Sequence, residues 1–215
     1  MSIAAPLIRR WFDLPDRAPA PSAYDEALLD RLLPQAGRIT LVTGPSGGGK
    51  SSLLTALRRR HGKLRWVGPN DIALPNQPVI DCVTSAIGGE GEAAVLAALE
   101  AISRVGMAEA WTYLQTPAQL SDGQRWRLIL ALCLITARRA QAVTIIEVDE
   151  FAALLDRVTA AVVARSLRRL IDTTPLIGAV VVTSHDDLAL ALKPDVQITC
   201  DFGTTHIDGR VAGSK

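Results

Sequence analysis

The sequence predicts an α/β fold in which helices cover both faces of a mainly parallel sheet. An apolar segment at 39–43 is followed by a glycine-rich turn and a helical stretch at about 50–60. From residue 143 to residue 200, apolar strand-like segments alternate with helical stretches, which is typical of parallel sheets. The 215 residues, 48% of them hydrophobic and 21% charged, are expected to fold around one core.

The first 37 residues are expected to form a loop-rich lead-in to a single domain that spans residues 38–215. Three prolines fall within residues 13–23, where they oppose regular structure. A short helix is expected after them, at 24–33.

The middle of the chain is expected to be helical. A short strand at 65–67 precedes an alanine-rich stretch, 78–114, whose helical periodicity is broken by glycines. A mostly apolar helix follows at 124–138, so a small helical subdomain is expected over about 78–138. The remaining expected elements are strands at 143–148, 179–183 and 196–200 and helices at 159–172 and 186–192.

The glycine-rich turn reads Gly44-Pro-Ser-Gly-Gly-Gly-Lys50-Ser51, which fits the pattern G-x-x-x-x-G-K-[ST] between a strand and a helix. Glycines let backbone N–H groups point at phosphate oxygens, and the following helix offers its positive end. Lys50 is expected to reach the β- and γ-phosphates, and the Ser51 hydroxyl to bind Mg²⁺. This predicts a P-loop NTPase fold. The expected nucleotide-binding residues are Gly44, Pro45, Ser46, Gly47, Gly48, Gly49, Lys50, Ser51 and Ser52.

Two adjacent carboxylates, Asp149 and Glu150, follow the apolar segment 143–148. In a parallel sheet this strand end faces the ligand crevice. Asp149 is therefore expected to hold Mg²⁺ through water, and Glu150 to take a proton from the attacking water.

Three further segments resemble motifs of ABC-type ATPases and stand in the order of that family. Leu120-Ser121-Asp122-Gly123-Gln124 resembles the L-S-G-G-Q signature, with Asp122 in place of the first glycine. The segment 153–156, Ala-Leu-Leu-Asp, resembles the D-loop, and His185 at the end of an apolar strand resembles the switch histidine. The resemblance covers roughly residues 38–200 and places the signature in the helical subdomain.

This resemblance implies an ATPase that binds ATP with Mg²⁺ in a head-to-tail homodimer and changes the conformation of an unknown macromolecular partner. The signature residues would contact nucleotide held by the second chain, and Ser121 is also suited to cap its own helix. The implied catalytic residues are Glu150, His185 and Lys50, the metal ligands Ser51 and Asp149, the signature residues Ser121, Asp122, Gly123 and Gln124, and the D-loop residue Asp156.

Some residues depart from the pattern of transporter subunits. Phe151 follows the Asp-Glu pair where proline is usual, and Gln77 comes later than a Q-loop glutamine after the strand at 65–67 and Gly68-Pro69-Asn70. The set of motifs is similar to soluble ABC ATPases that occur fused to an acetyltransferase-like domain, and a soluble member is favoured. The aromatic candidates to stack on adenine are Trp11, Phe12 and Tyr24.

Two alternatives stay open. The chain could be the ATP-binding subunit of a membrane transporter, with a membrane-spanning partner, or a nucleotide-switched binding module that hydrolyses little ATP. The presence of Glu150 argues against the second alternative. A kinase or GTPase is less favoured because neither explains the elements at Ser121 and His185.

The bulk composition sets limits on partners and location. A formal net charge of +1 gives no reason to expect nucleic acid. Cys82, Cys133 and Cys200 have apolar neighbours and are expected to be buried thiols in a reducing compartment. The longest apolar run, 128–135, is far shorter than the roughly 20 residues of a membrane-spanning helix. Since the N-terminus also lacks a secretory pattern, a cytoplasmic location is expected.

Overall fold

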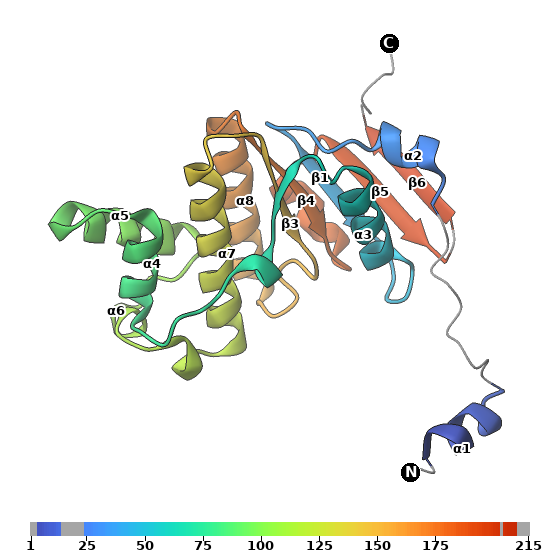
Figure 1. Ribbon diagram of the computed structural model, residues 1–215, viewed down its shortest axis with the longest axis horizontal. Helices are drawn as coiled ribbons and strands as arrows, with labels where there is room; N and C mark the ends of the chain where they lie inside the picture. The colour runs from blue at the N-terminus through green and yellow to red at the C-terminus, as the bar shows by residue number, and fades with distance from the viewer. Residues whose placement is uncertain (1–3, 14–23, 203, 210–215) are drawn as a thin grey trace.

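The computed structural model describes residues 4–13, 24–202 and 204–209, and a six-stranded sheet lies at its centre (Figure 1). The strand order is β2-β3-β4-β1-β5-β6, with β1 to β5 parallel and β6 antiparallel to β5. This confirms the expected α/β fold with a mainly parallel sheet. The strands are β1 (Ile39–Thr43), β2 (Arg65–Val67), β3 (Thr144–Val148), β4 (Ile177–Val182), β5 (Val196–Asp201) and β6 (Thr204–Gly209).

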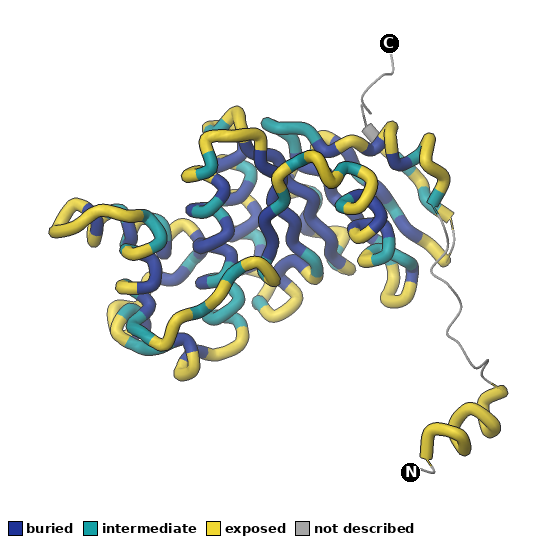
Figure 2. Tube along the Cα trace, viewed as in Figure 1, coloured by how far each residue is buried: buried dark blue, intermediate teal, exposed yellow. Residues whose placement is uncertain are grey.

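Helices cover both faces of the sheet, so that the inner strands are buried on both sides (Figures 1 and 2). Neighbouring residues of a strand point to opposite faces. In β1, Leu41 joins a core shared with α4 (Val79–Ile87), α5 (Gly91–Arg104), α7 (Asp122–Arg139), α8 (Arg157–Thr173) and α9 (Ala189–Leu192). Val42 joins a core shared with α2 and α3. The helices of the second core are α2 (Glu26–Arg31) and α3 (Lys50–Arg60).

The middle of the chain is helical, as expected. Its long helix α7 (Asp122–Arg139) begins two residues before the expected start, because Ser121 caps it. The Ser121 Oγ accepts a bond from the Gln124 N–H, and the Gln124 side chain accepts one from the Ser121 N–H, which satisfies two donors of the first turn. The other elements here are α4 (Val79–Ile87), α5 (Gly91–Arg104), α6 (Ala110–Tyr113) and a 3-10 turn at Pro117–Gln119.

The remaining helices are α8 (Arg157–Thr173), α9 (Ala189–Leu192), the 3-10 turns Pro69–Asp71 and Asp186–Leu188, and α1 (Ala4–Trp11), which buries none of its residues. Pro15, Pro19 and Pro21 of the expected lead-in lie outside the described residues. Cys82, Cys133 and Cys200 are buried thiols, as expected. Within the described part of the chain, no single helix is long and apolar enough to cross a membrane. The pair α4 and α5 has the required length and composition only when both helices are taken together, and the pair is bent by 108°.

The parallel arrangement determines where the functional residues meet. Val42 of β1 lies beside Val182 of β4, and Val148 of β3 lies beside Val181. The carboxyl ends of β3, β4, β1 and β5 therefore meet at one edge of the sheet in that order. The glycine-rich loop and Asp149 both follow strands at this edge.

Candidate functional site

The glycine-rich loop between β1 and α3 packs tightly against the end of β5. Gly44 has a φ of +136°, and a Cβ atom there would lie 2.0 Å from the carbonyl oxygen of Cys200. Any residue other than glycine would therefore displace the loop or the strand. Gly49, with a φ of +98°, precedes the first residue of α3, so the helix N-terminus opens directly onto the loop.

The Lys50 ammonium lies at the mouth of this loop. It donates hydrogen bonds to the carbonyl oxygens of Gly44 at 2.8 Å and Pro45 at 2.7 Å. An ammonium group has three donors, so one N–H remains for an anion in the loop. The loop thus combines a held cation with the positive end of α3, which is an arrangement suited to phosphate.

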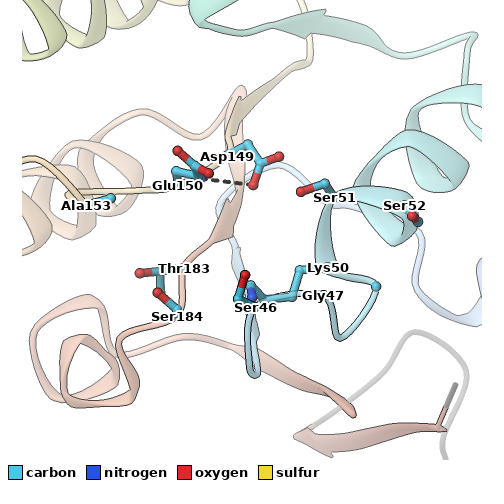
Figure 3. Close-up of a pocket in the computed structure, with 11 residues that line it drawn as sticks. Ser46, Gly47, Lys50, Ser51, Ser52, Asp149, Glu150, Ala153, Thr183 and Ser184 are labelled. Carbon is cyan, nitrogen blue, oxygen red and sulfur yellow. Dashed lines mark hydrogen bonds between the residues drawn. The ribbon is translucent and has the colours of Figure 1, made fainter. Parts of the chain in front are cut away.

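A cavity of about 360 Å³ joins the loop to the carboxylates after β3 (Figure 3). The Ser51 side chain points across it toward Asp149. Asp149 is half-buried, and its Oδ1 accepts a bond of 2.9 Å from the Glu150 N–H. The cavity is lined by Ser46, Gly47, Gly49, Lys50, Ser51, Ser52, Asp149, Glu150, Ala153, Thr183 and Ser184.

Glu150 has a left-handed backbone, with a φ of +51°, and a buried neighbour maintains this turn. Phe151 is fully buried, and its ring packs edge to face on that of Trp126, with the two ring centroids 5.4 Å apart. The Phe151 N–H donates to the Val182 carbonyl at 2.8 Å, and the Thr183 hydroxyl donates to the Phe151 carbonyl at 3.1 Å. Phe151, which departs from the transporter pattern, is thus the anchor that directs Glu150 toward the cavity.

The end of β4 supplies Thr183 and Ser184 to the cavity wall, and sequence reasoning missed both. His185, the residue expected there, is half-buried and is not among the lining residues. Its N–H donates to the Thr183 hydroxyl at 3.2 Å. The sequence signal that could have indicated this part of the cavity wall is the pair of hydroxyl residues, Thr183 and Ser184, directly before His185.

The signature residues do not line the cavity of their own chain. Ser121 and Asp122 are exposed at the start of α7. Gly123 packs on the D-loop-like segment, because a Cβ there would lie 3.0 Å from the Leu154 carbonyl oxygen. Asp156 caps α8 by accepting bonds from the Val158 and Thr159 N–H groups. The hydrogen bond from the Thr159 hydroxyl, together with these N–H groups, lowers the pKa of Asp156.

A second cavity, of about 440 Å³, shares Ser51, Asp149 and Glu150 with the first. Asn70 lines it, whereas Gln77, which comes later in the sequence than a Q-loop glutamine, lines neither cavity. The wall of this second cavity also contains Glu147, which lies on β3 two residues before Asp149. Sequence reasoning missed Glu147. Glu147 forms an ion pair with Arg58, which also pairs with Asp71 at 3.4 Å.

Burial raises the pKa of Glu147 above its ordinary value of 4.5, against the opposing effect of Arg58. The folded protein therefore holds this proton more tightly than the unfolded chain does. The contribution of Glu147 to the free energy of unfolding should then decrease as pH rises through 4.5 toward the raised pKa. We expect Glu147→Gln to gain stability relative to the unsubstituted protein as pH rises from about 4 to about 7.

Urea denaturation across this pH range measures the effect, with the exposed Glu92→Gln as the matched control. A difference between Glu147→Gln and the unsubstituted protein that stays constant with pH would contradict the assigned direction of the shift.

No protein-family model matches the sequence, and no curated protein matches it. Solved structures do match the fold. The dimeric ATP-binding cassette MJ0796, bound to ADP and Pi in a post-hydrolysis state, is 20% identical over 82% of this chain and 87% of that one, with a TM-score of 0.62. The cassette cbiO1 from Clostridium perfringens, part of the ABC transporter complex cbiONQ, is 18% identical over 81% of this chain and 77% of that one, with a TM-score of 0.56. A bacterial Atm1-family ABC exporter with ATP bound is 17% identical over 80% of this chain and 34% of that one, with a TM-score of 0.58. This chain therefore has the fold of ABC ATP-binding cassettes.

Proposed function

We propose that this chain binds ATP with Mg²⁺ in the cavity beside the glycine-rich loop and hydrolyses it. The observation that carries this proposal is one cavity lined both by Lys50 and Ser51, at the start of α3, and by Asp149 and Glu150, which follow β3. A held cation and a helix N-terminus suit the triphosphate, and two carboxylates opposite suit a metal ion and a base.

The oxygen donors present fit Mg²⁺. Ser51 and Asp149 offer a hydroxyl and a carboxylate, and Mg²⁺ is typically bound by few protein ligands, with waters and phosphates completing its shell. Among the described residues no group of three or more His, Cys, Asp or Glu side chains could hold a metal ion by itself. When bound, the metal would neutralise charge on the phosphates.

Glu150 would serve as the general base. It would take a proton from a water whose oxygen attacks the γ-phosphorus, while the bond between that phosphorus and the bridging oxygen breaks and ADP leaves. The anchored Phe151 maintains the turn that presents Glu150 to the cavity. Lys50 would bind the β- and γ-phosphates, and Thr183, Ser184 and the nearby His185 would lie on the side of the γ-phosphate.

The active form proposed is a head-to-tail homodimer formed on ATP binding. The signature residues Ser121 to Gln124 are absent from the cavity of their own chain, and Ser121 is exposed at a helix N-terminus. These residues would therefore contact a nucleotide only if that nucleotide were held by the glycine-rich loop of a second copy of the chain. The similar cassette MJ0796 is dimeric, which supports this arrangement.

Mixing two inactive variants tests this arrangement. Ser121→Arg is expected to bind ATP in its own loop but not to hydrolyse it, because its arginine would occupy the place from which the signature contacts the nucleotide of the second chain. Lys50→Ala should not bind ATP. In a mixture, one site of each mixed dimer joins the intact loop of the first variant to the intact signature of the second, so phosphate release should reappear.

The matched control is Ser103→Arg, at an exposed position near the end of α5, which should keep its activity. Two variants that stay inactive when mixed, or a Ser121→Arg variant with full activity, would argue against the shared site.

We further propose a soluble, cytoplasmic ATPase that acts on an unidentified macromolecule. The alternative is the ATP-binding subunit of a membrane transporter, which the likeness to cbiO1, part of a transporter complex, favours. Affinity purification of the ATP-bound protein from solubilised membranes and from the soluble fraction separates the two. Co-purification of a protein with several membrane spans would support the transporter.

A further inference from the structure

Phe202 is an aromatic residue in an unexpected place. It lies in the turn between β5 and β6, where its residue is 72% exposed and its φ is +35°. Turns of this length in hairpins favour glycine, asparagine or aspartate because these residues accept a positive φ. A phenylalanine there opposes both the backbone preference and the burial of apolar groups. A residue that violates two local preferences is a candidate for a functional role.

The Phe202 ring lies beside the glycine-rich loop. A Cβ atom built on Gly47 would be 3.8 Å from the Phe202 Cε1. The base of the turn is held there as well, since the Cys200 carbonyl contacts the position of Gly44. The ring therefore lies next to the phosphate-binding loop.

The order of the strands indicates which part of a nucleotide would meet this ring. Asp149 and Glu150 follow β3, the loop follows β1, and Phe202 follows β5, on the other side of β1. If the carboxylates face the metal and the γ-phosphate, as in the proposed function, the chain of phosphates crosses the loop away from β3. The nucleoside then emerges on the side of β5.

The other aromatic candidates have different surroundings. The Tyr24 hydroxyl donates a bond of 2.9 Å to the Gly49 carbonyl, and its half-buried ring packs against the core between α3 and the sheet. Tyr24 thus supports the loop from the side that faces the hydrophobic core. Trp11 and Phe12 are at the end of α1, which buries none of its residues.

We propose that Phe202 is the platform on which the base of the bound nucleotide stacks. This proposal rests on the proposed ATP site and identifies its base-binding residue. Stacking on an aromatic ring tolerates different bases, because each base has a π-face. The site should therefore discriminate little between ATP and GTP through this contact.

Phe202→Asn is the sharpest test, because asparagine suits a positive φ and removes the ring without straining the turn. We expect ATP and ADP to bind roughly 5- to 150-fold more weakly, the loss expected for one base-stacking contact. Inorganic tripolyphosphate with Mg²⁺ should bind as before, because it has no base. Isothermal titration calorimetry measures both ligands.

Two further variants complete the test. Phe202→Trp should restore affinity, and ATP but not tripolyphosphate should quench its added fluorescence. Trp111→Ala, which removes another exposed aromatic residue, should change neither affinity. Equal affinity of Phe202→Asn and the unsubstituted protein for ATP, or an equal loss for ATP and tripolyphosphate, would overturn the role of Phe202. Failure of the unsubstituted protein to bind either ligand would instead refute the ATP site itself.

Discussion

Replacement of Lys50 by alanine is expected to abolish ATP binding. The loop would lose the ammonium that lies at its mouth, while the triphosphate keeps its charge. ATP at a hundredfold excess over its Kd should stabilise the unsubstituted protein by about 2.7 kcal/mol. For a chain of this size, each kcal/mol raises the Tm by roughly 2–4 °C. Thermal melting with and without Mg²⁺ and ATP should show this shift in the unsubstituted protein and none in the variant.

Lys63→Ala is the matched control, because Lys63 is an exposed lysine after the end of α3. It should keep the full shift. If Lys50→Ala keeps it too, the loop is not the nucleotide site.

Glu150→Gln is expected to slow hydrolysis by roughly 10² to 10⁴, the range for loss of a general base. This corresponds to about 3–5 kcal/mol of activation barrier. The amide has the shape of the carboxylate but does not usefully accept a proton. Because opening of the dimer would depend on hydrolysis, this variant should accumulate as a dimer with Mg²⁺ and ATP. Removal of a negative charge beside the γ-phosphate would favour the same state.

Phosphate release and size-exclusion chromatography with light scattering, in ATP, ADP and no nucleotide, measure the two effects separately. Glu92→Gln, on α5, should behave like the unsubstituted protein. Normal hydrolysis by Glu150→Gln would remove Glu150 from the catalytic role. An inactive variant that stays monomeric with ATP would leave the base in place and count against the dimer.

Local sequence patterns predicted most of the fold. The expected bounds of β1 and α3 match the structure because an apolar run and a glycine turn define them within a few residues. β6 was not expected, since Thr-Thr-His-Ile-Asp-Gly has little apolar character and gains its stability by pairing with β5. The helix expected at 186–192 is divided into a 3-10 turn and α9.

The candidate site was predicted where its residues are neighbours in sequence. The loop and the Asp149–Glu150 pair meet in one cavity, as the parallel-sheet argument required. Glu147 and Phe202 were missed because their proximity to the loop depends on the strand order and on contacts between distant segments. No periodicity within one segment contains that information.

The contact between Gly123 and the segment 153–156 has a consequence for sequence variation among homologues. The Asp122 side chain is 78% exposed and forms only a surface ion pair with Arg125, so many residues would be accommodated there. At position 123, a methyl group would meet the Leu154 carbonyl at 3.0 Å and the Leu155 side chain at 3.3 Å. Packing within one chain therefore accommodates many residues at the first of these two positions, and we expect divergent sequences to retain glycine at the second.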